Sequence, residues 1–239
     1  MRTLGIDLAS RDDRTGVCVL RWAERVGIEA LSVGAGDAAL LELAAGADAV
    51  GIDAPFGWPE AFVSWVAGER PRQAWTTGLR DRLRFRRTDA WVKERTGRWP
   101  LSVSSDLIAV PAMRCALLLD RLGVTDRSGD GRVFETYPAA SLACFDLPAR
   151  GYKGRRGRER RRALVKALVA RTPWIEWTRR QRERCVAEDD ALDALVAALV
   201  AGAAHRGLTE RPSPEDRAAA RREGWIHLPR VRLPELAPA

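Results

Sequence analysis

The sequence is poor in the residues that build most zinc sites and disulfide frameworks. It contains 2 histidines and 4 cysteines among 239 residues. The cysteines are widely spaced, with no C-x-x-C pair, at Cys18, Cys115, Cys144 and Cys185. Structural zinc sites usually need paired ligands of this kind. We therefore expect small buried thiols in a reducing compartment rather than zinc ligands or disulfides.

Long hydrophobic runs are missing as well. No apolar stretch approaches the roughly 18 residues of a membrane-spanning helix, and the N-terminus enters a strand at once, without a signal-peptide pattern. We therefore expect a cytoplasmic protein with no membrane segment. The hydrophobic content of 46% suffices for a packed core, and the length fits a single domain over residues 1–239 that carries insertions.

Lysine is rare, occurring only as Lys93, Lys153 and Lys166, so nearly all of the positive charge comes from arginine. The net charge of +8 and the isoelectric point near 10.1 favour a polyanionic partner such as nucleic acid. An arginine- and alanine-rich chain can equally reflect GC-rich codons. The charge alone leaves both explanations open, and the sequence does not indicate an oligomeric state.

What the sequence does contain is a strand pattern that ends twice in an aspartate, as Gly5-Ile6-Asp7 and as Gly51-Ile52-Asp53. An unpaired carboxylate is costly in a buried strand. The residues between the two patterns predict two further strands and a helix, and a strand that follows a helical crossover usually pairs in parallel beside the first. We therefore expect Asp7 and Asp53 on neighbouring strands, at the same end of the sheet.

The other elements complete an α/β pattern, and the fifth strand carries another acid, Glu135, near its end. We expect strands over residues 3–10, 15–22, 26–33, 48–54 and 131–136. We expect helices over residues 37–46, 60–68, 106–122, 139–145 and 188–204.

Two segments are rich in basic residues. A helical insertion at about residues 58–125 interleaves arginines, Arg72 among them, with large aromatic residues. These aromatic residues are Trp75, Phe85, Trp91 and Trp99. Basic and aromatic residues together suit single-stranded nucleic acid, but tryptophans packed inward beside solvated arginines would give the same sequence. The segment at about residues 150–185 is also basic, and part of its charge is the solvated side of a helix.

The helix at residues 188–204 begins with a cluster of acids. Asp190 and Asp193 are three residues apart and share one side of the helix, and Asp189 with Asp193, four apart, does so equally well. Acids in a first turn can simply complement the helix dipole, but Asp193 lies further in, among alanine and leucine. Clustered carboxylates repel one another unless a cation neutralises them. Oxygen ligands favour Mg²⁺ or Mn²⁺.

Several phrases, in order along nearly the whole chain, resemble the domain-of-unknown-function 429 family, whose members are regarded as predicted ribonuclease H-like nucleases. Two strand aspartates and a late helix with Asp-x-x-Asp-Ala also resemble the wider ribonuclease H-like superfamily, particularly its Holliday-junction resolvase branch. The phrases are Gly5-Ile6-Asp7, Gly51-Ile52-Asp53-Ala54-Pro55-Phe56-Gly57-Trp58-Pro59, Arg87-Thr88-Asp89, Glu135-Thr136-Tyr137-Pro138-Ala139, Gly151-Tyr152-Lys153-Gly154, Asp189-Asp190-Ala191-Leu192-Asp193-Ala194 and Glu223-Gly224-Trp225-Ile226.

The resemblance implies a ribonuclease H-like mixed sheet of five strands in the order 3-2-1-4-5, with strand 2 antiparallel and helices on both faces. It also implies two-metal hydrolysis of phosphodiester bonds in DNA or RNA. In that scheme Asp7 bridges two Mg²⁺ or Mn²⁺ ions, Asp53 and Glu135 complete one ligand shell, and Asp190 with Asp193 completes the other. Resolvases usually carry Glu where this chain has Asp53, so either Glu135 compensates or the site is tuned differently.

Two cations are candidates for contacts with the substrate phosphate, because positive charge beside a scissile phosphate stabilises the developing negative charge. They are Arg87 and Lys153. Arg87 could instead form a structural ion pair with Asp89, and Lys153 could be an ordinary surface lysine.

Three functions are compatible with these features. The first is a metal-dependent nuclease. The second is a non-catalytic nucleic-acid-binding protein with a vestigial site, whose binding would depend on salt but not on metal. The third is an actin-like ATPase, suggested by Gly5-Ile6-Asp7-Leu8-Ala9-Ser10, but the chain lacks the second domain and the Gly/Thr-rich phosphate loops of that class.

Overall fold

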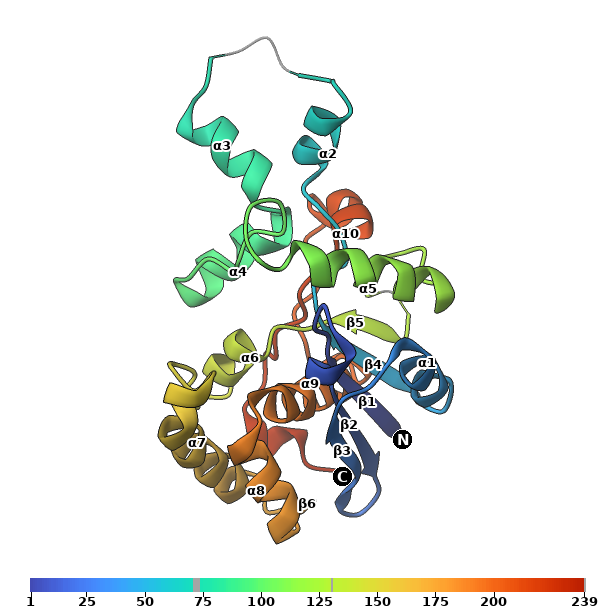
Figure 1. Cartoon of the computed structure of the whole chain (residues 1–239), viewed down its shortest axis with the longest axis vertical. Coiled ribbons are helices and arrows are strands. Elements are labelled where there is room, and N and C mark those ends of the chain that lie inside the picture. Colours follow the sequence, from blue (N-terminus) through green and yellow to red (C-terminus); the bar gives the residue numbers. More distant parts are fainter. Residues whose placement is uncertain (71–73, 130, 239) are drawn as a thin grey trace.

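The computed structural model describes residues 1–70, 74–129 and 131–238. Within them, the chain forms an α/β fold around a mixed sheet of six strands (Figure 1). The strands are β1 (Arg2–Asp7), β2 (Gly16–Trp22), β3 (Val26–Val33), β4 (Ala49–Asp53), β5 (Val133–Glu135) and β6 (Ile175–Glu176). The helices are α1 (Asp37–Ala45), α2 (Glu60–Val66), α3 (Thr77–Arg84), α4 (Arg87–Thr96), α5 (Ala109–Arg121), α6 (Pro138–Cys144), α7 (Arg158–Arg171), α8 (Arg179–Ala187), α9 (Asp189–His205) and α10 (Arg217–Glu223).

The sheet order is β5-β4-β1-β2-β3-β6. Strand β2 is antiparallel to both β1 and β3, whereas β4 is parallel to β1 and β5 is parallel to β4. The expectation of five strands is wrong in one detail, because β6 adds a sixth at the outer edge of β3. A strand of two residues inside a basic stretch carries no alternating pattern that the sequence could reveal.

Side-chain alternation along β1 decides what each face of the sheet contacts. Leu4 and Ile6 belong to the core cluster that includes residues of α1 and α5. Thr3 and Gly5 face the opposite way, where Thr3 Oγ1 donates a hydrogen bond to the carbonyl of Ala198 in α9. Asp7 continues this second series, so its position in the strand directs it to the α9 face.

Helix α9 is buried from Ala191 through Ala204, as expected for a helix that is apolar all round. It packs directly on strand backbone at two glycines. A Cβ atom at Gly5 would lie 2.0 Å from the Ala194 carbonyl oxygen, and one at Gly51 would lie 2.4 Å from that of Ala197. This close packing brings the N-terminal end of α9 to the sheet edge where β1 and β4 end.

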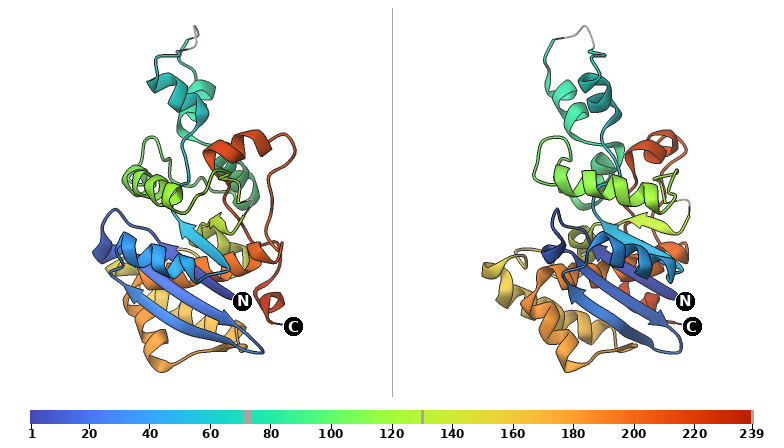
Figure 2. Two further views of the ribbon diagram at one scale, coloured as in Figure 1. Left: turned by 90° about the vertical axis from the view of Figure 1, so that its right-hand side faces the viewer. Right: turned by 45° about the vertical axis from the view of Figure 1, so that its right-hand side comes forward.

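The predicted insertion forms α2 to α5 between β4 and β5. Figures 1 and 2 show α2 and α3 projecting away from the sheet, with α4 and α5 nearer to it. Residues 71–73 of the insertion, Arg72 among them, lie outside the described residues. The C-terminal segment returns to the sheet edge, where Ile226 bridges Glu135 of β5. Across the described parts of the chain, each helix is too short or too polar to span a membrane.

Candidate metal centre

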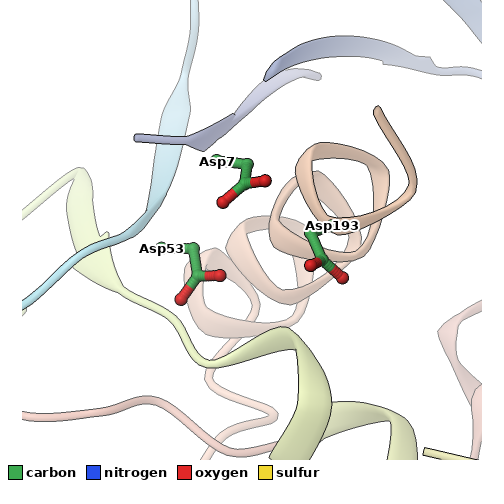
Figure 3. A group of neighbouring side chains, drawn as sticks. All are labelled: Asp7, Asp53 and Asp193. Carbon is green, nitrogen blue, oxygen red and sulfur yellow. The ribbon is translucent and has the colours of Figure 1, made fainter. Parts of the chain in front are cut away.

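Three carboxylates from three elements meet at the C-terminal ends of β1 and β4. Asp7 and Asp53 are the last residues of these parallel strands and are paired in register. Asp193 lies in the second turn of α9. One oxygen from each carboxylate lies within 4.8 Å of the others, and Figure 3 shows the three groups around a common space. The structure thus brings together the two strand acids and one of the predicted helix acids.

Burial makes the charged forms of these acids costly. It raises the pKa of Asp53 to about 7, with Lys153 pulling the pKa down and Asp193 and Glu135 pushing it up. Burial and then the charges of Asp193 and Asp53 raise the pKa of Asp7 well above its ordinary value. Burial also raises the pKa of Asp193, against the influence of Lys153. Three acids with raised pKa values in one place form a group that a cation would stabilise.

The two oxygens of Asp193 have different surroundings. Oδ1 accepts a hydrogen bond of 2.7 Å from the Tyr152 hydroxyl. Oδ2 lies 2.7 Å from Lys153 Nζ, so the lysine ammonium is its charged partner. The three acids of the group offer only carboxylate oxygens, which fits the ligand chemistry of Mg²⁺ or Mn²⁺.

Two predicted ligands, Asp190 and Glu135, lie outside this group. Both oxygens of Asp190 accept hydrogen bonds from Arg14, at 2.8 and 3.0 Å. Both oxygens of Glu135 accept hydrogen bonds from Arg86, at 2.8 and 3.0 Å, and the Phe56 N–H donates to one of them as well. Each of these carboxylates is therefore neutralised by an arginine. The other helix candidate, Asp189, accepts a hydrogen bond from the Gly154 N–H.

The two predicted phosphate contacts are placed differently. Lys153 reaches the carboxylate group from a loop, with its side chain 53% exposed. Arg87 is turned to the surface and pairs with Asp216. The sequence left open an ion pair between Arg87 and Asp89. This pair does not form, because Asp89 pairs with Arg86 instead.

Sequence reasoning missed Tyr152 and Arg86 as parts of the site. Tyr152 is buried and touches the carboxylate group through Asp193, and its place between Gly151 and Lys153 was the one available signal. Arg86 is buried against Glu135. It was indistinguishable in the sequence from the other arginines of the insertion, because only the fold reveals which arginine is buried.

A cavity of about 460 Å³ opens beside the carboxylate group. Asp7, Asp53 and Lys153 belong to its lining, and the insertion contributes Trp99 and Leu101. The volume falls within the range of small-molecule sites. Asp7 and Asp53 are thus accessible from a pocket that the sheet and the insertion build together, whereas Asp193 lies buried behind its lining.

Comparisons with known proteins add one finding. The model of a family described as "Protein of unknown function (DUF429)" matches residues 5–218. No curated protein and no solved structure matched the chain.

Proposed function

This chain belongs to the DUF429 family, and we propose that it is a metal-dependent nuclease with a ribonuclease H-like fold, which hydrolyses phosphodiester bonds in DNA or RNA. The observation that carries the proposal is the meeting of Asp7, Asp53 and Asp193 within 4.8 Å beside an open cavity. Acids placed so close together lower the stability of the fold. A role in binding a cation would explain why they are there.

In this proposal Asp7, Asp53 and Asp193 hold Mg²⁺ or Mn²⁺. The bound ion supplies Lewis-acid chemistry and lowers the pKa of water, as metal ions do in phosphodiester hydrolysis. Tyr152 would hold the Asp193 carboxylate in place by its hydrogen bond to Oδ1, and Oδ2, which now lies beside Lys153, would be the oxygen available to the ion. Lys153 is tethered beside the carboxylates but half exposed, so its ammonium can also contact a substrate phosphate and stabilise negative charge.

A basic groove between α7 and α8 supports a polyanionic substrate. Gly154, next to Lys153, lines a groove whose charges balance, because its arginines are matched by an equal number of acids. These residues are Arg14, Arg155, Arg158 and Arg161, with Asp13, Glu188, Asp189 and Asp190. Arg158 also lines a second groove between α7 and α8, whose further basic residues are Arg162, Lys166 and Arg182. The two grooves share Arg158, and the excess of positive charge lies in the groove between α7 and α8. A groove with this charge suits a nucleic-acid backbone.

The test is cleavage of labelled DNA and RNA oligonucleotides with Mg²⁺ or Mn²⁺. We expect cleavage by the wild-type chain and a loss of at least about 100-fold on Asp7→Asn, since even outer-shell partners of a metal are worth 10–100-fold. Asp120→Asn, which changes an exposed carboxylate of α5, should cleave normally. Metal binding with no cleavage of single strands, duplexes and branched junctions would contradict the proposal.

A second candidate is a nucleic-acid-binding protein with a vestigial site. The contact between Lys153 and Asp193 favours it, because a tethered ammonium already offsets part of the negative charge. This candidate predicts binding that weakens with salt but is the same in EDTA and in Mn²⁺. The nuclease predicts that titration calorimetry detects Mn²⁺ binding, and a stoichiometry of two would favour the two-metal scheme.

A further inference from the structure

The cavity beside the carboxylates has an aromatic wall made by the segment between α4 and α5. Trp99 and Leu101 line the cavity, and their side chains remain 42% and 56% exposed. Exposed apolar and aromatic side chains that line a pocket are typical of ligand-binding sites. By contrast, Trp91 of the same insertion packs against Trp225, with ring centroids 4.9 Å apart. Within the insertion, Trp91 is therefore packed, whereas Trp99 is exposed at the cavity.

Trp99 is already the end of a stack. Its ring lies on Phe85, with centroids 3.9 Å apart and an interplanar angle of 17°. The guanidinium of Arg84 lies 4.8 Å from the centroid of Phe85. The stack thus contains an arginine, a phenylalanine and a tryptophan, and Phe85 keeps the indole plane fixed. A fixed aromatic plane loses little conformational entropy when a flat ligand joins it.

The polar residues of the cavity indicate what such a ligand carries. Arg98 and Arg150 line the cavity with Lys153. In the described part of the chain, neither Arg98 nor Arg150 forms an ion pair within the protein. Exposed arginines without acidic partners suit phosphate groups. The cavity therefore combines a stacking surface, free positive charge and a carboxylate group.

We propose that this cavity binds one unpaired nucleobase of the substrate, which stacks on Trp99 while its neighbouring phosphate lies at Lys153 and the carboxylates. A paired base is covered on both faces and reaches such a pocket only by leaving the helix. The substrate class is thus a single strand, or a duplex with an unpaired nucleotide beside the cut. This inference rests on the proposed nuclease function and adds the structure of the substrate to it.

The first test scans a single abasic nucleotide along a single-stranded oligonucleotide, in DNA and RNA versions. One abasic position next to the cut should lower the wild-type cleavage rate about tenfold, a loss typical of one base–aromatic stack. Trp99→Ala should cleave the intact strand about tenfold more slowly and show no further loss at that position. Trp99→Phe, which restores an aromatic face, should recover most of the rate.

The matched control is Trp75→Ala. Trp75 lies in the same insertion and is 66% exposed, but it is not among the cavity residues. This variant should behave like the wild type in the scan, and melting curves should show that Trp99→Ala remains folded. An abasic scan without a sensitive position, or equal sensitivity in Trp99→Ala, would overturn the inference while leaving the nuclease proposal intact.

A second readout does not depend on cleavage. Oligonucleotides with 2-aminopurine at each position in turn are mixed with the wild-type chain and with Asp7→Asn. Stacking should quench the fluorescence at one position, and Trp99→Ala, but not Trp75→Ala, should abolish the quenching. Quenching without cleavage would support the base pocket and count against the nuclease. The absence of both would remove both proposals.

Discussion

Asp190 and Asp193 are three residues apart on α9, yet their carboxylates have different partners. Three residues correspond to about 300° of rotation in a helix, so the two side chains diverge by roughly 60°. That angle turns Asp190 toward Arg14, and Asp193 toward Asp7 and Asp53. At the residue scale, the partner of each acid decides whether its charge is free to bind a cation.

The first prediction separates these two acids. Asp193→Asn should weaken Mn²⁺ binding at least about 100-fold, because it removes a carboxylate from the ligand group. Asp190→Asn should weaken Mn²⁺ binding about tenfold or less. Asp190 is already neutralised by Arg14 and acts on the ion only through long-range electrostatics. Titration calorimetry measures both affinities. Equal losses would place Asp190 in the ligand shell, as the two-metal scheme requires.

The second prediction concerns pH and Asp53. Burial disfavours the carboxylate and raises the pKa of Asp53 from its ordinary value of 3.8 to about 7 in the folded chain. A raised acid pKa gives stability that is complete below about pH 4 and is lost as pH rises through 7. In EDTA the melting temperature should therefore fall between pH 5 and 8. The increase caused by Mn²⁺ should grow over the same range, since ligands bind metal when deprotonated.

Asp53→Asn is the control for this titration. It should flatten the fall of the melting temperature in EDTA and reduce the Mn²⁺-dependent increase at pH 8. A difference in melting temperature between the wild type and Asp53→Asn in EDTA that stays constant from pH 5 to pH 8 would contradict the assignment of a raised pKa at this site.

At the scale of elements, the site depends on how closely α9 packs on β1 and β4. The helix has no room for a Cβ atom at Gly5 or Gly51, so the approach is set by backbone against backbone. This spacing places the second turn of α9 over the ends of the two strands. Glycine normally lowers the stability of a strand. Here the burial of an entire helix face offsets that loss of stability.

The third prediction tests this packing. In Gly5→Ala the added methyl group would meet the Ala194 carbonyl and the Ala198 N–H, both backbone groups that cannot rotate away. We expect a loss of about 3 kcal/mol or more in the free energy of unfolding. Gly27→Ala on β3 is the control, since the nearest atom would be a guanidinium nitrogen of Arg21 at 3.6 Å. Urea denaturation measures both, and similar losses would contradict the packing argument.

At the scale of the whole molecule, Arg86 joins parts of the chain that are distant in sequence. Its guanidinium donates to Asp89 at the start of α4, to Glu135 of β5 and to the carbonyl of Glu223 at the end of α10. The Glu223 carboxylate in turn accepts from the backbone of Glu60 in α2 and of Arg87 in α4. The insertion, the sheet edge and the C-terminal segment are thus held by one buried network.

The fourth prediction compares neighbouring arginines. Arg86→Leu leaves the carboxylates of Asp89 and Glu135 buried without a cation, which should cost about 3–5 kcal/mol of stability. Arg87→Leu removes an ion pair to Asp216 from a side chain that is 59% exposed and should cost about 1 kcal/mol or less. Chemical denaturation followed by circular dichroism gives both values. A larger loss for Arg87→Leu would mean that the network is not what holds these segments.

Much of the site was accessible from the sequence because it depends on local pattern. An aspartate at the end of an apolar strand, repeated at Asp53, indicates a buried acid wherever the strands are placed. The helix with Asp193 among apolar residues indicates a third. These patterns hold because burial is periodic in strands and helices, and an acid in a buried position needs a partner.

Sequence alone determined the α/β pattern, the strand aspartates and the apolar helix that opens with acids, since side-chain periodicity and the cost of burying charge act within each segment. Only the tertiary structure decided which arginine neutralises Glu135 and Asp190, which tryptophan is packed and which lines the cavity, and that Tyr152 and Lys153 divide the oxygens of Asp193 between them. These contacts depend on distances between residues that are far apart in the chain. The packing of the complete fold sets those distances, and no local sequence pattern encodes them.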